Sequence, residues 1–171
     1  MNYKNGQLFI ENISVKKIEK KFKSPAYVYS LKQLKNNIFN FKKEFKSINP
    51  LICFSVKSNS NLEILKVIKS YGLGADVVSL GEMLIALKAG IKKDKIVFSG
   101  VGKTFEELNF AINKNILLIN TESEDEIKDI EKIAMKKGKK VNIGVRLNPD
   151  TDAKTLSKIS TGKKEDKFGL N

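Results

Sequence analysis

From about residue 50 onward, short apolar runs alternate with longer segments in which apolar residues recur every three or four positions. Short runs rich in β-branched and aromatic residues predict strands, whereas the spacing of three or four predicts helices. The predicted strands cover residues 51–57, 74–79, 95–100, 116–122 and 141–148. The predicted helices cover residues 62–72, 81–90, 104–115 and 123–138. Strands that alternate with helices in this way indicate an α/β fold with a parallel sheet and right-handed crossovers.

The ends of the predicted helices carry the expected capping residues. Three of the four helices end at a glycine, namely Gly72, Gly90 and Gly138, and glycine is common just past a helix. Ser123 followed by Glu126 fits a capping box at the start of the last helix. These signals support the predicted helix boundaries.

Two architectures fit five such units, and the alternation within the strands helps to choose between them. In the first strand Ile52, Phe54 and Val56 share one face, and smaller or polar residues share the other. The last strand repeats the pattern, with Gly144 and Arg146 opposite its large apolar residues. An open doubly wound sheet, covered by helices on both sides, should be apolar on both faces. We therefore expect a (β/α)8 TIM-type barrel, of which about the first five units are present, with the open doubly wound sheet as the alternative.

Three polar residues lie at strand ends that a barrel would direct to its carboxyl-terminal mouth, where barrel enzymes place their chemistry. They are Lys57, Asp76 and Arg146. We expect Lys57 to be partly desolvated on the inward face, which favours a neutral, nucleophilic amine. The alternatives are a snorkelling Lys57, and an Asp76 that is an ordinary strand-end hydrogen bonder or forms a structural ion pair with Arg146.

A glycine-rich stretch from Lys95 to Leu108 suggests a nucleotide-binding loop, because it ends in Gly-Lys-Thr between a strand and a helix. The phosphate-binding motif needs a further glycine where this chain has Val97, and an acidic residue for magnesium where the next strand ends in Asn120. We interpret the stretch as a tight strand-to-helix turn in which Lys103 needs no role of its own.

The charge of the chain does not indicate a nucleic-acid partner. The net charge is +13, yet the basic residues are interleaved with acidic ones and lack an aromatic stripe on which bases could stack. Arg146 is the only arginine among the 32 basic residues, although arginine is the preferred residue for base and phosphate recognition. We expect a solvated, lysine-coated surface.

Composition also restricts the class of protein and the compartment. The 171 residues are 41% hydrophobic, enough for one globular core, and include no histidine, so histidine catalysis and histidine metal sites are excluded and no metal site is predicted. The single cysteine, Cys53, is expected to be a small buried apolar residue. No apolar run is long enough to cross a membrane and no signal peptide is evident, so we expect a cytoplasmic protein without a membrane partner.

Five stretches of the chain together resemble the fold-type III pyridoxal-phosphate enzymes. They are CFSVKSNSN, GLGADVVSLGE, KIVFSGVGKT, INTESEDE and VRLNPDTDAKTLSKISTGKKEDKFGLN. The last is the most specific, because its NP-D-K-T, ISTG and KFG elements are similar to the diaminopimelate decarboxylase branch. The resemblance runs from about Ser24 onward and implies a barrel of the alanine-racemase/decarboxylase kind. Leu156 departs from the pattern, which usually has histidine there.

The resemblance also implies roles for individual residues. Lys57 matches the catalytic Schiff-base lysine that holds pyridoxal 5'-phosphate. Asp76 and Arg146 match residues that line the cofactor pocket, and Glu82 matches another acid of that pocket. Glu82 also fits a first-turn helix acid favoured by the helix dipole.

The activity implied is pyridoxal-phosphate-dependent decarboxylation of meso-2,6-diaminopimelate to L-lysine and carbon dioxide, the last step of lysine biosynthesis, by a homodimer whose active site lies at the interface. The alternatives are a non-catalytic or regulatory pyridoxal-phosphate-binding barrel, and a decarboxylase or racemase of another basic amino acid.

The expected domains are residues 1–23, which associate with a β domain, and residues 24–171, a partial pyridoxal-phosphate-binding barrel. We expect the strand around residues 7–13 to lack its usual partners. We also expect the chain to be inactive alone, because the family's cofactor-stacking histidine, phosphate loop and C-terminal β domain follow this region.

Overall fold

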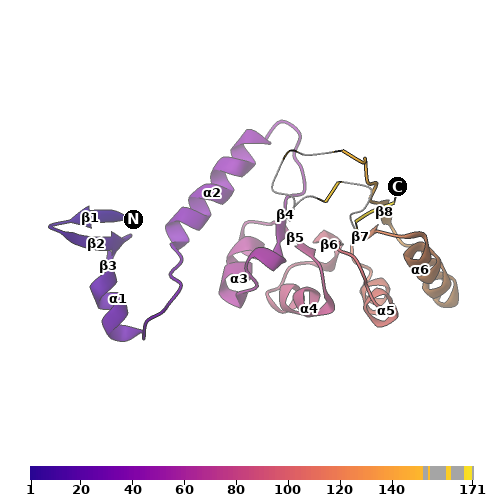
Figure 1. The fold of residues 1–171 in the computed structure, drawn as a ribbon, viewed down its shortest axis with the longest axis horizontal. Coiled ribbons are helices and arrows are strands. Elements are labelled where there is room, and N and C mark those ends of the chain that lie inside the picture. The colour runs from indigo at the N-terminus through magenta and orange to yellow at the C-terminus, as the bar shows by residue number, and fades with distance from the viewer. Residues whose placement is uncertain (152–153, 155–160, 163–167, 171) are drawn as a thin grey trace. The chain divides into compact units, whose positions relative to one another are not determined.

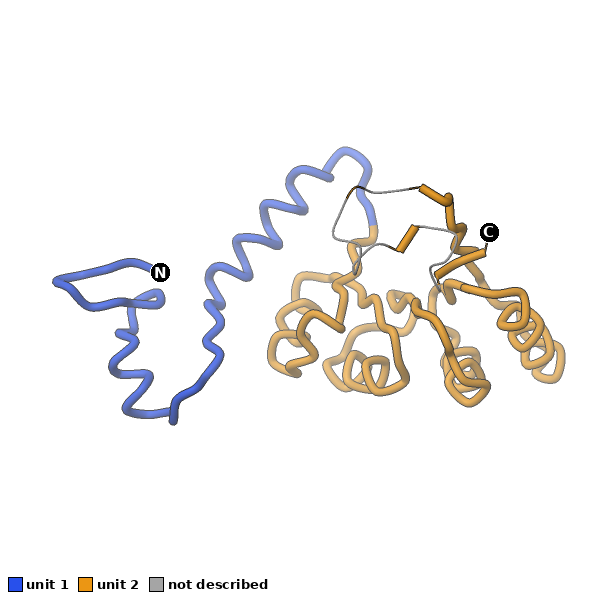
Figure 2. The backbone as a smooth tube through the Cα atoms, viewed as in Figure 1, with its two compact units in different colours: residues 1–50 blue, residues 51–171 orange. Residues whose placement is uncertain are grey.

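The computed structural model describes residues 1–151, 154, 161–162 and 168–170. It divides into two compact units, residues 1–50 and residues 51–171 (Figure 2). The predicted division at residue 23, which concerns association with a separate β domain, stays a prediction. Several residues of the last motif, Leu156, Ile159, Ser160 and Lys167, lie outside the described residues.

The first unit is a small antiparallel sheet followed by two helices. Its elements are β1 (Asn2–Lys4), β2 (Gln7–Ile10), β3 (Ile13–Ser14), α1 (Val15–Lys21) and α2 (Leu31–Glu44). The strand predicted around residues 7–13 is present, since β2 pairs with β1 on one side and with β3 on the other. That it lacks its usual partners from a β domain stays a prediction. Glu11 connects this sheet to the start of α2, since its carboxylate accepts hydrogen bonds from Ser30 Oγ (2.8 Å) and Lys32 N (2.9 Å).

The second unit contains all five predicted strands and the four predicted helices between them. In chain order the elements are β4 (Cys53–Ser55), the 3₁₀ turn η1 (Val56–Ser58), α3 (Leu62–Ser70), β5 (Gly74–Val77), α4 (Leu80–Lys88), the 3₁₀ turn η2 (Lys93–Lys95), β6 (Ile96–Phe98), α5 (Phe105–Lys114), β7 (Leu118–Thr121), α6 (Glu124–Lys137) and β8 (Ile143–Val145). No helix among the described residues is both long and apolar enough to span a membrane.

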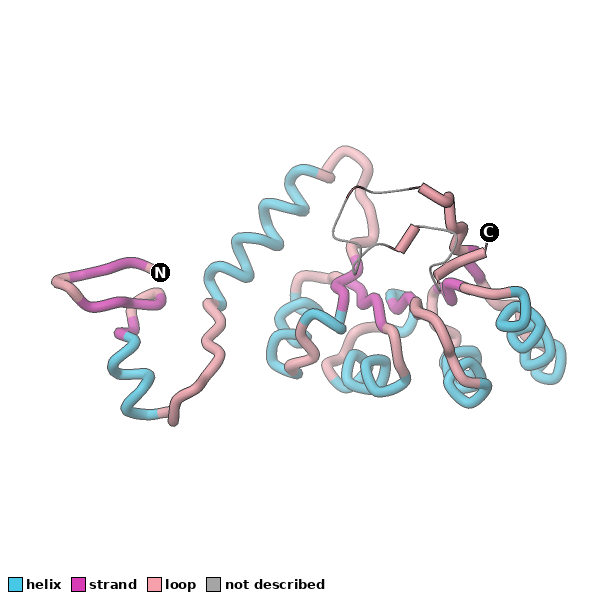
Figure 3. The backbone as a smooth tube through the Cα atoms, viewed as in Figure 1, coloured by secondary structure: helices cyan, strands magenta, loops and turns pink. Residues whose placement is uncertain are grey.

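The arrangement of these elements is that of a partial barrel. The five strands are parallel and neighbour one another in chain order, β4-β5-β6-β7-β8, without a reversal of direction across the sheet. Helices α3 to α6 lie along the same side of this sheet (Figures 1 and 3). A doubly wound sheet would carry helices on both faces and reverse its strand order. The predicted barrel is therefore confirmed, and the open doubly wound alternative is wrong.

The core lies between the strands and their helices, as the alternation within the strands predicts. Ala75 and Val77 of β5 and Phe98 of β6 are fully buried on the helix side. Asp76, between the two buried residues of β5, faces the other way. Apolar residues thus fill the outer layer, and polar residues are left for the barrel interior.

The last strand departs from this pattern. Ile143 and Val145 occupy the apolar face of β8, yet they are 40% and 48% exposed. β8 pairs with β7 and forms one edge of the five-stranded sheet, so its outer face has less cover than the central strands. The sequence predicted the face correctly but not its exposure.

Gly74, at the start of β5, leaves no room for a side chain. A Cβ atom there would meet the carbonyl oxygen of Lys95 and lie 2.8 Å from Cys53 Sγ, closer than real Cβ contacts, and it would lie 3.2 Å from the carbonyl carbon of Lys95. Cys53 is half-buried, and burial raises the pKa of its thiol, to which the negative charge of Asp76 adds. The thiol therefore stays neutral near pH 7 and packs as a small apolar group.

Candidate active site

A cavity of about 470 Å³ lies at the carboxyl ends of the strands in the second unit. Its lining brings together Lys57, Asp76, Val78, Ser99, Gly100, Val101, Arg146 and Phe168. Three of the four predicted site residues are in this set. The carboxyl-terminal mouth is where barrel enzymes carry out their chemistry, so this cavity is the candidate active site.

Lys57 is presented to the cavity by the tight turn η1 directly after β4. The turn is closed by hydrogen bonds from Asn59 N to Val56 O (3.0 Å) and from Ser58 Oγ to Ser55 O (2.7 Å), and the fully buried Val56 fixes it to the core. The Lys57 side chain is exposed. The expected desolvation of Lys57 is therefore wrong for this chain, because the residue lies in a turn beyond the end of an edge strand.

Asp76 lies at the centre of a row of polar side chains on the inner face of the sheet. Ser99 Oγ donates to Asp76 Oδ1 at 2.6 Å, and Ser55 Oγ lies 3.5 Å from Asp76 Oδ2. Asn120 Nδ2 donates to Ser99 Oγ at 3.0 Å. The row therefore joins β4, β5, the end of β6 and β7, and it fixes the direction of the Asp76 carboxylate.

Arg146 follows β8 and reaches the cavity wall with a partner that the sequence did not predict. Its Nη1 donates to Glu122 Oε1 at 3.2 Å, and its guanidinium lies 4.6 Å from the centre of the Phe168 ring. Gly169 N also donates to Glu122 Oε2 at 3.0 Å. The ion pair suggested between Asp76 and Arg146 is therefore replaced by one between Glu122 and Arg146.

Glu82 is held at the start of α4. Its Oε2 accepts a hydrogen bond from Val78 N (3.0 Å), and its own N–H donates to Ser79 Oγ (3.2 Å). This is the geometry of a helix cap, and it agrees with the alternative that Glu82 is a first-turn acid favoured by the helix dipole. Glu82 is not among the residues that line the cavity, and its role at a cofactor stays a prediction.

Lys103, the lysine of the glycine-rich stretch, is a buried structural cation. Its side chain is 1% exposed and its Nζ donates to Gly100 O, Asn120 O and Glu126 Oε1, each at 2.6 Å. Gly100, with φ of +98°, makes the tight turn that the sequence predicted. The expectation that Lys103 needs no role of its own is wrong, because a buried ammonium has to be paired.

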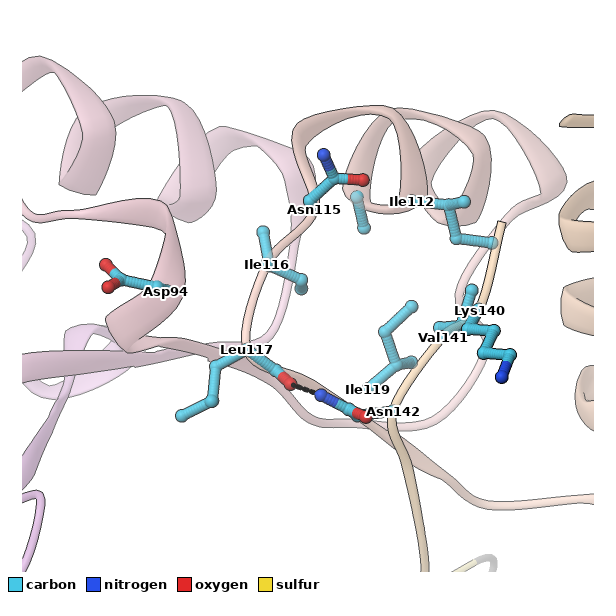
Figure 4. Close-up of a pocket in the computed structure, with 10 residues that line it drawn as sticks. Asp94, Ile112, Asn115, Ile116, Leu117, Ile119, Lys140, Val141 and Asn142 are labelled. Carbon is cyan, nitrogen blue, oxygen red and sulfur yellow. Dashed lines mark hydrogen bonds between the residues drawn. The ribbon is translucent and has the colours of Figure 1, made fainter. Parts of the chain in front are cut away.

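A second cavity, of about 280 Å³, lies at the opposite, amino-terminal ends of β7 and β8 (Figure 4). Its lining includes the apolar side chains of Ile112, Ile116 and Ile119. The amide of Asn142, at its edge, donates to Leu117 O at 3.1 Å. Because this end of a barrel usually serves stability, we do not assign the chemistry here.

The chain matches a family model over residues 31–171, described as pyridoxal-dependent decarboxylase, pyridoxal binding domain. The chain belongs to the pyridoxal-dependent decarboxylases. The resemblance seen in the sequence motifs is thereby confirmed at the level of the family.

Individual pyridoxal-dependent decarboxylases are similar over most or all of the chain. A diaminopimelate decarboxylase of Aquifex aeolicus is 43% identical over 171 residues, and one of Helicobacter pylori strain J99 is 51% identical over 149 residues, or 87% of the chain. A crystal structure of diaminopimelate decarboxylase from M. jannaschii in co-complex with L-lysine superimposes with a TM-score of 0.90 at 37% identity and covers 99% of the chain. The chain covers 40%, 37% and 40% of these three proteins, respectively.

The residues of the cavity fit pyridoxal phosphate. Its aldehyde needs an amine, which Lys57 offers, and its anionic groups need a cation, which Arg146 offers beside the ring of Phe168. The volume of about 470 Å³ lies within the range usual for small-ligand sites. The same lining therefore supplies the amine, the cation and the space.

Proposed function

We propose that this chain is the pyridoxal-phosphate-binding part of an enzyme that decarboxylates meso-2,6-diaminopimelate to L-lysine and carbon dioxide. The observation that supports it most is the cavity that collects Lys57, Asp76 and Arg146 in a member of the decarboxylase family. The names of the similar proteins from A. aeolicus and H. pylori support the substrate. The whole enzyme is proposed to act as a homodimer with its active site at the interface.

Lys57 is proposed to hold the cofactor, because its amine nitrogen would condense with the cofactor's aldehyde and the aldehyde oxygen would leave as water. Its position in the turn η1, with Val56 buried, fixes the backbone while the side chain stays free to move. The same nitrogen can later carry a proton to or from the substrate, since a lysine amine is both base and acid. Lys57 is therefore the one residue of the cavity that contributes a covalent bond.

Asp76 and Arg146 are proposed to orient the bound group. Asp76 is directed by Ser99 and holds a negative charge on the inner face, where it can keep a nearby ammonium or ring nitrogen protonated. Arg146 supplies a positive charge whose direction is set by Glu122 and Phe168. When bound, pyridoxal phosphate supplies the electron-accepting ring that takes up the electron pair left by departing carbon dioxide.

Cofactor binding without catalysis by this chain is a second candidate. The exposure of Lys57 favours it, because decarboxylation gains from a site that excludes water. On this candidate the chain would bond the cofactor at Lys57 and release no carbon dioxide from diaminopimelate.

Borohydride reduction of the chain with pyridoxal phosphate, followed by peptide mapping, tests the proposed function. We expect the pyridoxyl group on Lys57, in the peptide that contains CFSVKSNSN, and no such label in Lys57→Ala. Lys66→Ala, which removes a lysine exposed on α3, is the matched control and should keep the label. A label spread over surface lysines, or one that survives in Lys57→Ala, would contradict the proposal.

Assay of carbon dioxide release from meso-2,6-diaminopimelate, by this chain and by the whole enzyme, separates the two candidates. Release by the whole enzyme that is lost in Lys57→Ala supports the decarboxylase. A selective label at Lys57 without release by either protein supports binding alone.

A further inference from the structure

Glu122 is a nearly buried carboxylate directly beside the candidate site. Its side chain is 4% exposed, and each of its oxygens has a partner from a different segment. Oε1 accepts from Arg146 Nη1 at 3.2 Å, and Oε2 accepts from Gly169 N at 3.0 Å. A carboxylate removed from water is stable only with such partners, so the burial of Glu122 and the position of Arg146 depend on each other.

The backbone of Glu122 connects this ion pair to a second one. Glu122 N donates to Glu126 Oε2 at 3.0 Å, and Glu126 Oε1 accepts from Lys103 Nζ at 2.6 Å. Lys103 also donates to Gly100 O. The contacts thus run from Gly100 to Arg146, and both of these residues line the cavity. We name the four charged residues Lys103, Glu126, Glu122 and Arg146 the ionic chain.

Arg146 lies between two groups that restrict it. They are the Glu122 carboxylate, 3.2 Å from Nη1, and the ring of Phe168, whose centre lies 4.6 Å from the guanidinium carbon. The Arg146 side chain is nevertheless 38% exposed, so without Glu122 the guanidinium could turn toward water. An arginine side chain has several rotatable bonds, and its partners determine where its charge lies.

We propose that Glu122 is a positioning residue that fixes the guanidinium of Arg146 at the cavity wall, with the rest of the ionic chain fixing Glu122. Only the consequence of this inference rests on the proposed function, namely that the cation is already in place when pyridoxal phosphate arrives. The geometry of Glu122 and Arg146 is independent of that function. Glu122 itself is not among the residues that line the cavity, so it acts through Arg146.

Arginine-selective modification measures this positioning directly, because Arg146 is the only arginine in the chain. Phenylglyoxal modifies guanidinium groups, so mass spectrometry can follow the modified fraction of this one residue with time. Loss of a charge-assisted hydrogen bond should free the guanidinium, so Glu122→Gln should react at least about threefold faster than wild type. Glu122→Asp, which keeps the charge, should fall between the two rates.

The matched control is Glu131→Gln, which removes an exposed carboxylate of α6. It should leave the modification rate at the wild-type value. A Glu122→Gln rate equal to that of wild type would overturn the positioning role. Equal acceleration by both variants would also overturn it, because the effect would then reflect net charge.

Nuclear magnetic resonance of the unmutated chain keeps the inference testable if Glu122→Gln does not fold. With ¹⁵N-labelled arginine, the Arg146 Nε–H group gives one signal. We expect this signal to be shifted from that of free arginine and to show a side chain as ordered as the backbone. A signal at the free-arginine position with fast side-chain motion would overturn the proposal.

The cofactor experiment separates this inference from the proposed function. If Glu122→Gln accelerates modification but wild type never gives a label at Lys57, Glu122 positions Arg146 and the proposed function fails. If wild type is labelled at Lys57 and the modification rates are equal, the proposed function stands and the positioning role fails. If both hold, pyridoxal phosphate should bind Glu122→Gln several-fold more weakly than Glu131→Gln.

Discussion

The turn after β4 and the loop after β6 each carry a lysine just beyond the end of a strand, and the structure uses the two lysines in opposite ways. Lys57 is exposed at the cavity, whereas the Lys103 side chain is 1% exposed and donates to three oxygens. The residue type does not explain the difference. The acceptors that other elements bring to each lysine explain it.

The acceptors around Lys103 come from distant parts of the chain. Glu126 belongs to α6 and Asn120 to β7. Around Lys57 the nearby hydroxyls have other partners, since Ser58 bonds the backbone of Ser55 and Ser55 lies beside Asp76. Lys57 is thereby left available for the covalent bond that we propose, whereas Lys103 links the loop after β6 to β7 and α6.

Replacing each lysine in turn should give the largest difference in stability between the two regions. Lys103→Met leaves the Glu126 carboxylate buried and unpaired, which should lower the free energy of unfolding by about 3–5 kcal/mol. Lys57→Met removes an exposed side chain and should change it by less than about 0.5 kcal/mol. Urea denaturation of both variants provides the measurement. A loss in Lys103→Met as small as that expected for Lys57→Met would show that Lys103 is not a buried structural cation.

A double variant tests the Lys103–Glu126 ion pair itself, with a smaller expected effect. Lys103→Met combined with Glu126→Gln removes both charges and keeps a side-chain acceptor for Glu122 N. It should recover about 1–3 kcal/mol relative to the sum of the two single losses, because the two residues interact directly. Strict additivity in a double-mutant cycle would argue against the ion pair.

Ser99→Ala tests the polar row that joins the two regions. The variant removes the hydroxyl that donates to Asp76 and accepts from Asn120, and it should lower the free energy of unfolding by about 1–2 kcal/mol. Ser60→Ala, at an exposed serine near Lys57, is the matched control and should have almost no effect. An unchanged denaturation midpoint for Ser99→Ala would mean that the row contributes nothing to stability.

The helix cap after Lys103 predicts a weak dependence of stability on pH. Partial burial alone would raise the pKa of Glu107, but hydrogen bonds from Thr104 N and Leu80 N outweigh it and hold the pKa below its ordinary value of 4.5. A carboxyl with a lowered folded-state pKa stabilises the protein above the unfolded pKa, and this stability is lost as the pH falls through the folded value.

Glu107→Gln should therefore destabilise the chain at about pH 7, and the difference from wild type should disappear toward about pH 3. Thermal unfolding at several pH values measures it. Glu106→Gln, at an exposed acid of the same helix turn, is the control and should show little change. A constant difference for Glu107→Gln across this range would contradict the cap.

The smallest expected effect concerns nucleotides. Because the Lys103 ammonium is buried with three acceptors, it has no free direction in which to bind phosphate. ATP with magnesium should leave the melting temperature of the chain unchanged. A saturable shift would show that the loop after β6 opens to bind nucleotide.

Short-range patterns in the sequence predicted most of the fold. Helices and strands can be predicted from the spacing of apolar residues that are close in the sequence, and helix caps from residues three apart. Even so, the capping box predicted at Ser123 is only half formed. Ser123 Oγ accepts from Glu126 N as expected, but the Glu126 carboxylate bonds Glu122 N and Lys103. The reciprocal box forms instead at Thr104 and Glu107.

The candidate site was predictable only in part, because some of its contacts join residues that are far apart in the sequence. Lys57, Asp76 and Arg146 could be found because strand ends of a parallel barrel converge at one mouth. Glu122 was missed, and its partners Arg146 and Gly169 could not be predicted because they lie 24 and 47 residues away. The signal that could have found it is the acid at the end of the predicted strand 116–122, at the same mouth.

The close approach at Gly74 has a consequence for which sequences can form this barrel. A methyl group there meets the backbone of Lys95 and the sulfur of Cys53, whereas Gly102 has open space around its Cα and is restricted only by its φ of +71°. In a saturation library, position 74 should therefore accept glycine alone, and position 102 should also tolerate asparagine and aspartate, which adopt positive φ more readily than other residues. Substitutions at the neighbouring Cys53 should in turn be limited to small residues, because its sulfur already lies against the backbone at position 74.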